Sequence, residues 1–421
     1  MALAALSAIL AVLTIGAIGF YAAGGWQVWR FFRRRPPARG HSPAPPAGPV
    51  SVMVPVCGFD DTTGAFLEAL CRQDYPDYEV LVGTTDPEDP AGPWLLRLAA
   101  AHPGRVRLFL GLPPHGPNRK DSILRDLVEA ARHDVLVFAD SDLRIDEGYL
   151  AAAVAPLADP AVGLVTFPYA GRRPKGLGQA LGSLGRCLDF IPGVLLARRL
   201  DGGLRFALGI TLATRRQALA AAGGLLLDRI GSDYNLGKRF AAAGYRVELP
   251  PLVLDWVAES DSIADLVRRE LRWARSIRFN RGPQYYSMVF CHGTLWCLLL
   301  LLASGGAGWA LGLAAATCGV RTLQALACVI ALGCPRLLPW LWAVPLRDLL
   351  SALVWLGGGF GRRVRWRGRL LRIRGDGLIS EDGAPPLRVA AVPGPAPVPV
   401  ALPVRAGGPA ARSPEPSRRA G

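Results

Sequence analysis

The stretch VLVFADSDLRID, Val135 to Asp146, decides how this sequence folds. Apolar residues typical of a buried strand run directly into carboxylates at Asp140, Asp142 and Asp146. Acidic groups beside a buried strand repel one another and lose hydration, which is costly. A chain that keeps them there usually needs them for a cation or a proton. The sequence therefore predicts a functional site at the end of this strand.

Similar apolar, β-branched runs recur between residues 50 and 170, and helical patterns separate several of them. The runs are Val50–Val56, Tyr78–Asp86, Arg105–Gly111 and Val162–Tyr169, and the helical patterns are Thr63–Arg72, Pro93–Ala101 and Lys120–Arg132. This alternation predicts an α/β fold with a parallel, doubly wound sheet. Ligands of such sheets bind outside the carboxyl ends of the strands. Asp86, Asp89, Asp140 and Asp142 all follow strands, so we expect them at one edge.

The composition indicates a soluble domain joined to membrane segments. Hydrophobic residues make up 51% of the 421 residues, which is high for a soluble protein, yet 19% are charged. The net charge is +15, and much of it follows apolar runs, at Arg30, Arg33, Arg34, Arg35, Arg39 and the segment Arg362–Arg374. Such clusters are typical of cytoplasmic anchors beside the bilayer. We therefore expect no nucleic-acid partner, and no protein partner is implied.

Composition divides the chain into seven parts. These are a transmembrane anchor with its N-terminus outside (1–29), a basic Pro-rich linker (30–49), the α/β domain (50–259), an amphipathic interfacial helix (260–284), a membrane region (285–361), a basic juxtamembrane segment (362–380) and a disordered tail (381–421). Because the α/β domain and the basic segment are both expected in the cytoplasm, an even number of crossings should separate them. The eight cysteines contain no C-x-x-C pair, which argues against a zinc site or a disulfide framework.

Two pairs of acids are candidates for binding a ligand. Asp140 and Asp142 can face one hard cation, since Mg²⁺ or Mn²⁺ takes carboxylate oxygens together with substrate phosphates. A solvated turn is the alternative. Asp86 and Asp89 can accept hydrogen bonds from a base or from ribose hydroxyls. Helix capping is the alternative for Asp89, because Pro90 and an apolar run follow.

Three further elements carry candidate residues. Asp233, in GSDYNLG, could be a general base that takes a proton from an acceptor hydroxyl, or simply a helix cap. Lys120 could contact phosphate at a helix start, or be solvated there. The arginines of an amphipathic helix over Ser260–Arg281 could lie on anionic lipid, or Arg272 could bind a leaving diphosphate. Trp273 would then pack under the donor or anchor at the interface.

Together, the ordered motifs PEDP, ADSD, SDY and R-x-x-R-W resemble those of the family 2 and family 21 glycosyltransferases. The closest likeness is to ceramide glucosyltransferases and bacterial hopanoid-biosynthesis glycosyltransferases. The stretches QDYPDYEVLVGTTDPEDPA, NRKDSIL, VGLVTFPYAG and RRELRWARSIR carry it. The likeness covers Val50–Arg281 well and the membrane part loosely. It implies a GT-A fold, which binds nucleotide sugars, on the cytoplasmic side of the bacterial inner membrane.

The resemblance also implies roles for the acids of the first strands. Asp89 matches the first acid of the family, near the nucleotide, with Asp86 beside it. Asp140 matches the second acid. Asp142 completes a D-x-D where the ceramide enzymes have glycine, and Lys120 lies in the stretch NRKDSIL, which is similar to that group.

The remaining motifs match the family with one departure. Asp233 matches the acid assigned as catalytic base, and Arg269, Arg272 and Trp273 match the (Q/R)-x-x-R-W element. Ser232 stands where many relatives carry Glu. A missing neighbouring carboxylate would lower the pKa of the base or alter the acceptor contacts.

The implied reaction moves a sugar from a UDP-sugar to a membrane lipid hydroxyl with inversion. The hopanoid likeness suggests N-acetylglucosamine on a hopanoid polyol, and the ceramide likeness suggests glucose on ceramide. A polysaccharide synthase would share the motifs but normally needs a longer membrane channel. A non-catalytic membrane scaffold is the alternative from another class, and intact acids at every motif argue against it.

Overall fold

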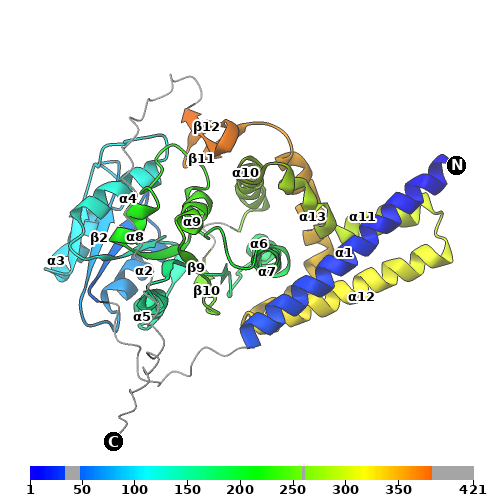
Figure 1. The fold of residues 1–421 in the computed structure, drawn as a ribbon, viewed down its shortest axis with the longest axis horizontal. Helices are drawn as coiled ribbons and strands as arrows, with labels where there is room; N and C mark the ends of the chain where they lie inside the picture. Colours follow the sequence, from blue (N-terminus) through cyan, green and yellow to red (C-terminus); the bar gives the residue numbers. More distant parts are fainter. Residues whose placement is uncertain (34–47, 258–260, 382–421) are drawn as a thin grey trace, which may run out of the picture.

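The computed structural model describes residues 1–33, 48–257 and 261–381, so most of the predicted linker and tail lie outside the described residues. Its centre is a seven-stranded sheet (Figure 1). Across the sheet the strands are β3 (Val106–Phe109), β2 (Tyr78–Gly83), β1 (Val50–Pro55), β4 (Val135–Ala139), β8 (Thr211–Arg215), β6 (Val162–Thr166) and β9 (Arg246–Glu248). The five strands predicted from the sequence are β1, β2, β3, β4 and β6, and these predictions are confirmed.

The sheet is mostly parallel but not entirely so. Val52 of β1 pairs with Val80 of β2 on one side and with Val137 of β4 on the other, in parallel. β8 runs antiparallel to both β4 and β6, so the prediction of a parallel sheet is wrong at this strand. Because of this reversal, the first residue of β8, Thr211, pairs with the last residue of β4, Ala139. The segment that enters β8 therefore joins the carboxyl edge of the parallel strands.

Helices cover both faces of the sheet and explain why its strands are continuously apolar. One face packs with α4 (Arg119–Ala130), α8 (Arg216–Ala221) and α9 (Ser232–Ala242), and the other with α2 (Asp61–Cys71), α3 (Gly92–Ala101), α5 (Tyr149–Val154) and η1 (Ala155–Ala158). Met53 points to the first core and its neighbours Val52 and Val54 point to the second, as strand pleating requires. The helices predicted over residues 63–72, 93–101 and 120–132 are present as α2, α3 and α4.

A second, small sheet extends the loop after β4. It joins β5 (Leu143–Arg144), β10 (Leu254–Trp256) and β7 (Tyr169–Ala170). Trp256 pairs with Leu143, and the Val257 N–H donates to the Asp142 carbonyl at 2.9 Å. This sheet fixes the backbone of the ADSD loop.

Among the described residues, four helical segments are long and apolar enough to cross a membrane, or five if a bent pair counts as one span. The four are α1 (Ala2–Arg33), α6–η2–α7 (Leu177–Gly185, Arg186–Phe190, Ile191–Leu200), α12 (Gly308–Ala331) and η4–α13 (Pro335–Ala343, Val344–Gly358). The bent pair joins α10–η3 (Ile263–Arg281, Gly282–Cys291) to α11 (Gly293–Ala303) at 60°. The α6–η2–α7 segment was not predicted, and most of it is buried inside the protein.

Three of these helices form an arm that leaves the α/β domain. α1 packs along α11 and α12, and the N-terminus lies at the end of the arm far from the sheet (Figure 1). The turn between α11 and α12 lies at the same far end. Large apolar side chains on these helices are exposed, including Ile9, Leu302 and Leu323. A surface of this kind is suited to lipid.

Charged residues that interrupt the apolar C-terminal region are buried in pairs. Arg321 of α12 forms an ion pair with Asp189 of η2 at 2.8 Å and another with Asp348 of α13. Arg347 of α13 donates to both carboxylate oxygens of Glu270 on α10, each at 2.8 Å. Buried charges persist where a partner compensates for lost hydration. These pairs connect the apolar helices α12 and α13 to η2 and to α10, which carries the RELRW motif.

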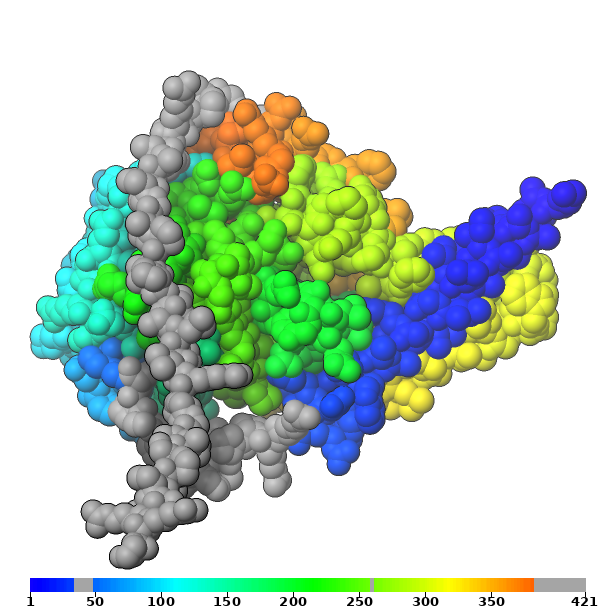
Figure 2. All heavy atoms as spheres, in the orientation of Figure 1, coloured from blue at the N-terminus to red at the C-terminus, as the bar shows by residue number. Residues whose placement is uncertain are grey.

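The basic segment after the last apolar helix folds back onto the α/β domain. It forms a sheet of β11 (Arg363–Trp366), β12 (Arg369–Ile373) and β13 (Ile379–Glu381), with η5 (Gly375–Gly377) before β13. Gly377 accepts a hydrogen bond from the Ile230 N–H at 2.9 Å, just before α9. Figure 2 shows this sheet against α10 on the surface of the molecule. Its contact with the α/β domain was not predicted from the sequence.

Candidate active site

The acids of the first strands lie at one edge of the sheet, together with the segment that enters β8. β1, β2 and β4 are parallel, so Asp86 and Asp140 follow strand ends on the same side. The Asp140 N–H donates to the carbonyl of Ile210 at 3.0 Å. The antiparallel β8 thus adds Gly209 and Ile210 to the predicted ligand edge.

Lys120 joins Asp140 to this segment. It lies in the first turn of α4, where its Nζ forms an ion pair with Asp140 Oδ1 and donates to the Gly209 carbonyl at 3.4 Å. Burial by itself would lower the pKa of Lys120, but Asp140, with Asp121 and Asp233 further away, outweighs burial and raises it. Lys120 is therefore a firmly charged ammonium beside the predicted cation ligand. The predicted phosphate contact at Lys120 stays a prediction, while its solvated alternative does not fit this ion pair.

Asp233 lies against the same segment from the other side. It is in the first turn of α9, whose N-cap is Gly231, so Asp233 does not cap the helix. A Cβ atom built on Gly209 would approach Asp233 Oδ2 to 2.7 Å, which means that the carboxylate rests directly on the glycine. Burial raises the pKa of Asp233, and Asp140 adds to this while Lys120 opposes it. A raised pKa suits a group that accepts a proton near neutral pH.

The contact between Gly209 and Asp233 gives a first prediction. Gly209→Ala should displace the Asp233 carboxylate, because 2.7 Å is too short for a carbon–oxygen contact. We expect a fall in kcat of about 100-fold, since misplacing a reacting group by about 1 Å costs that much. Nucleotide affinity should change little. Gly203→Ala, where a Cβ meets no atom within 4 Å, is the matched control. An unchanged kcat in Gly209→Ala would contradict a catalytic role for this contact.

A fully buried carboxyl, Asp121, holds the start of α9. Its Oδ2 accepts a hydrogen bond from Asn118 Nδ2 at 2.9 Å, and the Ser232 hydroxyl bonds to the carboxyl as well. Burial raises the pKa of Asp121 to about 7, against the opposing effects of Ser232 and Lys120. Asn118 also donates to the Arg229 carbonyl at 3.0 Å. The NRKD motif therefore fixes the loop that leads into Asp233.

Asp121 predicts a pH dependence of stability. A carboxyl whose pKa rises from 3.8 to about 7 on folding binds more protons in the folded state between those values. Below pH 4 the Asp121 carboxyl does not change the free energy of unfolding. As the pH rises from 4 to 7 it lowers this free energy more and more, and above pH 7 the loss is complete. Asp121→Asn should therefore raise the melting temperature relative to wild type at pH 8 and not at pH 4.

The size of this gain is on the order of 4 kcal/mol, from about 1.4 kcal/mol per pKa unit. Melting curves of both proteins in detergent between pH 4 and 8 measure it. Glu129→Gln removes an exposed carboxylate from the same helix and should give no such gain. Equal stability of wild type and Asp121→Asn across the range would refute the raised pKa.

Asp142 is held differently from Asp140. Its Oδ2 accepts a hydrogen bond from Trp256 Nε1 at 2.7 Å. Trp256 in turn lies under the guanidinium of Arg269, with the Arg269 Cζ 4.9 Å from the ring centroid. The structure thus links the second acid of ADSD to the RELRW element through one tryptophan.

The three candidate residues of RELRW, which are Arg269, Arg272 and Trp273, point in two directions. Trp273 is near the Arg269 Cζ, at 5.5 Å from its ring centroid, on the side facing Trp256. Arg272 lies between Trp273 and Trp366 of β11, at 5.8 and 5.6 Å from their ring centroids. Arg272 therefore meets the C-terminal sheet, while Arg269 faces the acids. α10 also contacts α13 and α6, so an interfacial location and a role at the site remain compatible.

Asp86 and Asp89 follow a strand end at the same edge as the other acids, but their hydrogen bonds go to nearby backbone groups. The buried Asp89 carboxylate accepts hydrogen bonds from the Gly58 N–H, at 3.0 and 3.1 Å, and from the Ala91 N–H at 2.9 Å. Asp89 thus joins the loop after β1 to the residues before α3. This role is similar to the helix-capping role that the sequence left open for it. Asp86 is exposed and accepts from the Glu88 N–H at 3.0 Å. Their predicted nucleotide contacts stay predictions.

The carboxylates fit a hard cation that keeps ligands from its substrate. No group of three His, Cys, Asp or Glu side chains in residues 1–33, 48–257 and 261–381 could hold a metal ion by itself. Asp140 and Asp142 supply oxygen donors only, and Mg²⁺ or Mn²⁺ commonly completes such a set with water and phosphate oxygens. The donor set therefore suits a cation shared with a phosphorylated ligand.

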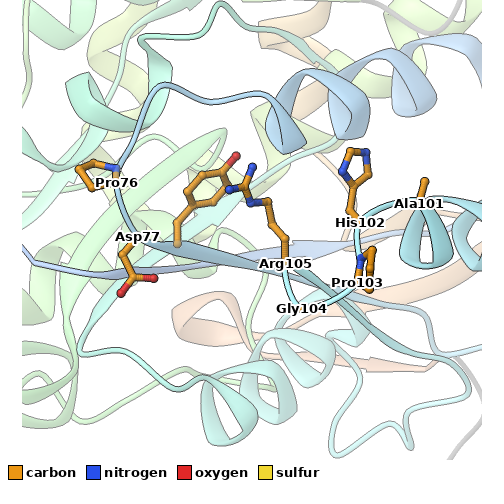
Figure 3. A pocket seen from close by; sticks show the side chains of 8 residues that line it. Pro76, Asp77, Ala101, His102, Pro103, Gly104 and Arg105 are labelled. Atoms are coloured by element: carbon orange, nitrogen blue, oxygen red, sulfur yellow. The ribbon is translucent and has the colours of Figure 1, made fainter.

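A hollow at the opposite edge of the sheet is not part of this site. It has a volume of about 430 Å³ and lies around Asp77, Tyr78, His102 and Arg105 (Figure 3). Tyr78 is the first residue of β2, so the hollow lies at the amino edge of the sheet, opposite the acids. Arg105 stacks over Tyr78 there, with its Cζ 4.6 Å from the ring centroid.

Sequence reasoning missed several residues that complete the site. Trp256 carries no motif, and Tyr169 looks like an ordinary strand residue. Arg186 could have been noticed, because it is a lone arginine in the apolar run of residues 177–188. Arg369 reaches the Pro117 carbonyl at 3.1 Å from a segment assigned to the membrane surface. Each contact joins residues far apart in the chain, so no local pattern predicts it.

Several solved structures resemble this chain. A mannosyltransferase from Pyrobaculum calidifontis in complex with GDP-Man and Mn²⁺ is 22% identical, with a TM-score of 0.49, over 83% of this chain and 99% of that one. Glucosyl-3-phosphoglycerate synthase from Mycobacterium tuberculosis, solved with Mn²⁺, UDP and glucosyl-3-phosphoglycerate, is 20% identical, with a TM-score of 0.38, over 58% and 80%. Residues 1–349 of S. aureus TarS are 15% identical, with a TM-score of 0.35, over 80% and 99%.

A family model described as glycosyl transferase family 21 matches residues 9–379. The match extends from α1 through the acids, the RELRW element and the apolar C-terminal helices to β13. The motifs that the sequence analysis assigned to catalysis all lie inside it. The chain therefore belongs to glycosyl transferase family 21 and is an enzyme of glycosyl transfer.

Proposed function

We propose that this enzyme transfers N-acetylglucosamine from UDP-N-acetylglucosamine to a hydroxyl of a hopanoid polyol, such as bacteriohopanetetrol, with inversion. The observation that carries the proposal is the meeting of Asp233 with Gly209 beside the Lys120–Asp140 pair. A half-buried base and a charged group suited to phosphate then lie at one strand edge.

The bond changes follow from these groups. Asp233 takes the proton of the acceptor hydroxyl, and the oxygen attacks the anomeric carbon from the side opposite the diphosphate. The bond between that carbon and the diphosphate oxygen breaks, and UDP leaves with the electron pair. One displacement inverts the anomeric centre. The raised pKa of Asp233, caused by burial, makes the carboxylate a stronger base than a solvated one.

Positive groups around the acids stabilise the departing diphosphate. Lys120 neutralises Asp140 in the free enzyme and is the group that we expect to turn to the phosphates of the donor. Arg272 and Arg269 of the RELRW element are the predicted guanidinium ligands of the diphosphate. A divalent cation held by Asp140 and Asp142 would supply further neutralisation of the leaving group.

The arm of α1, α11 and α12 supports a membrane location for the acceptor. The N-terminus and the α11–α12 turn share the end far from the α/β domain (Figure 1). We take η4–α13, which packs against α10, as a segment that does not cross. An outside N-terminus and two crossings, out through α11 and back through α12, would then leave the α/β domain and β11–β13 both in the cytoplasm. This agrees with the even number expected from the sequence. We propose the bacterial inner membrane as the bilayer.

The identities of sugar and lipid rest on the resemblance between motifs and not on a contact in the site. The test is UDP release by the detergent-purified enzyme with Mg²⁺ or Mn²⁺. UDP-N-acetylglucosamine and UDP-glucose are each paired with bacteriohopanetetrol or ceramide, and Asp233→Asn is the inactive control.

Release that requires UDP-N-acetylglucosamine, the hopanoid and Asp233 supports the proposal. Release only with UDP-glucose and ceramide would reassign the enzyme as a ceramide glucosyltransferase. Several sugars added in one chain would indicate a polysaccharide synthase. Failure to bind any UDP-sugar would favour the scaffold alternative.

A further inference from the structure

Arg186 is a buried cation that the proposed reaction has not used. It begins η2, the π-helical turn between α6 and α7, and only 4% of its surface is exposed. A π turn inside an α-helix often marks a functional position, because it shifts a side chain out of regular register. Here it directs a charged side chain into the wall beside the ADSD loop.

Aromatic rings cover the faces of the Arg186 guanidinium. Its Cζ lies 3.9 Å from the ring centroid of Trp256, 4.6 Å from that of Trp273 and 5.3 Å from that of Tyr169. Stacking of this kind stabilises a cation but leaves its N–H groups to find acceptors. Nη1 donates to the Gly182 carbonyl at 3.2 Å. Within residues 1–33, 48–257 and 261–381, Nε and Nη2 are buried and bond to no acceptor.

Arg186 differs in this respect from the two other fully buried arginines. Arg321 is paired with Asp189 and Asp348, and Arg347 is paired with Glu270. The described residues hold no carboxylate in an ion pair with Arg186. A buried guanidinium without a counter-charge is strongly destabilising unless a ligand supplies the charge.

The surroundings of Arg186 belong to the candidate site. Trp256, under its guanidinium, donates to Asp142, and Trp273 belongs to RELRW. Burial raises the pKa of Tyr169; the charge of Arg186 opposes this, and those of Asp233 and Asp142 add to it. Arg186 and Arg269 border the same point, because a Cβ on Gly182 would lie 3.9 Å from Arg186 Nη1 and 3.6 Å from Arg269 Nη2. Two guanidiniums so close together favour an anion between them.

We propose that Arg186 binds a phosphate oxygen of the donor diphosphate, together with Arg269. The diphosphate is the anionic group of the proposed reaction, and a neutral acceptor hydroxyl would leave the guanidinium charge uncompensated. The half-buried side chains of Arg269 and Trp273 pack beside Arg186. Because Nη2 is buried, a ligand reaches it only when one of these side chains moves. This inference rests on the proposed nucleotide-sugar donor and adds a residue outside the predicted motifs.

The test separates phosphate binding from nucleoside binding. Calorimetry with Mn²⁺ measures the affinities of UDP and uridine for the full-length enzyme in detergent. Arg186→Gln should weaken UDP binding by about 10-fold or more, the usual cost of a hydrogen bond to a charged group, and leave uridine binding unchanged. Arg186→Lys keeps the charge and should recover part of the loss. Arg198→Gln removes an arginine of α7 that stacks on Phe31 of α1, and it should change neither affinity.

An unchanged ratio of UDP to uridine affinity in Arg186→Gln would overturn the inference. If Arg186→Gln does not melt cooperatively, the same comparison is made with Arg186→Lys. A lysine lacks the planar guanidinium, so the variant should lower the affinity for UDP and leave that for uridine unchanged. A wild-type enzyme that binds neither UDP nor GDP would refute the proposed donor as well. Normal UDP binding by wild type with no effect of either variant refutes only the role of Arg186.

Discussion

Asp233→Asn should lower the rate of glycosyl transfer by about 10³-fold, while UDP binding stays within about twofold of wild type. General base catalysis contributes about 10²–10⁴-fold, and an amide in this position cannot take the proton of the acceptor. Asparagine keeps the shape of the side chain against Gly209, so the fold should not change. Initial rates of UDP release with saturating donor and acceptor give the loss in kcat.

The control for this variant is Asp228→Asn. Asp228 is in the same loop, and its carbonyl accepts the Ile379 N–H at 2.8 Å through the backbone alone. Its side chain contacts only Arg229 among its ion pairs in the described residues, at 3.7 Å. The rate should stay near that of wild type. Transfer by Asp233→Asn at more than about a tenth of the wild-type rate would remove Asp233 from the role of base.

Asp140→Ala should reduce kcat/KM by about 100-fold or more and abolish the dependence of UDP affinity on Mn²⁺. Loss of a carboxylate ligand removes the charge that holds a cation on the diphosphate, which is worth several kcal/mol in the transition state. The change also releases Lys120 from its ion pair. Calorimetry of UDP binding with Mn²⁺ and with a chelator measures the dependence directly.

The same strand offers a matched control at its other end. Asp134 precedes β4, and 91% of its side chain is exposed, so Asp134→Ala removes a carboxylate without touching the candidate site. Both variants should melt within a few degrees of wild type. If Asp140→Ala keeps Mn²⁺-dependent UDP binding, the cation is held elsewhere and the D-x-D assignment is wrong.

Local patterns in the sequence were enough to predict most of the sheet. The runs at β1, β2 and β4 are continuously apolar because helices bury both faces of these strands, and that demand is visible in composition alone. The meeting of acids at one edge follows from the parallel direction of the strands. Only β8 departed from the pattern, since strand direction depends on the connection and not on strand composition.

The candidate site was predicted as a set of residues but not as an arrangement. The sequence named Asp140, Lys120 and Asp233, yet it could not tell that the Lys120–Asp140 pair and Asp233 meet at Gly209. It also treated Asp140 and Asp142 as equal, whereas Trp256, 114 positions after Asp142, bonds to one of the two. Asp89 was assigned to the nucleotide, while its carboxylate accepts hydrogen bonds from the backbone of a neighbouring loop.

By itself the sequence determined the α/β class, the long apolar segments at both ends of the α/β domain and the acids at the strand ends. These depend on burial and spacing within about ten residues, where side-chain pattern and backbone period are coupled. Tertiary structure alone decided the reversal of β8, the return of β11–β13 to the α/β domain and the packing of three aromatic rings around Arg186. Each depends on contacts between distant segments, whose geometry is set by the packing of the whole chain. The hydrogen-bond and ion-pair partners of Asp140, Asp142 and Asp89 are therefore set by the folded enzyme and not by the local sequence.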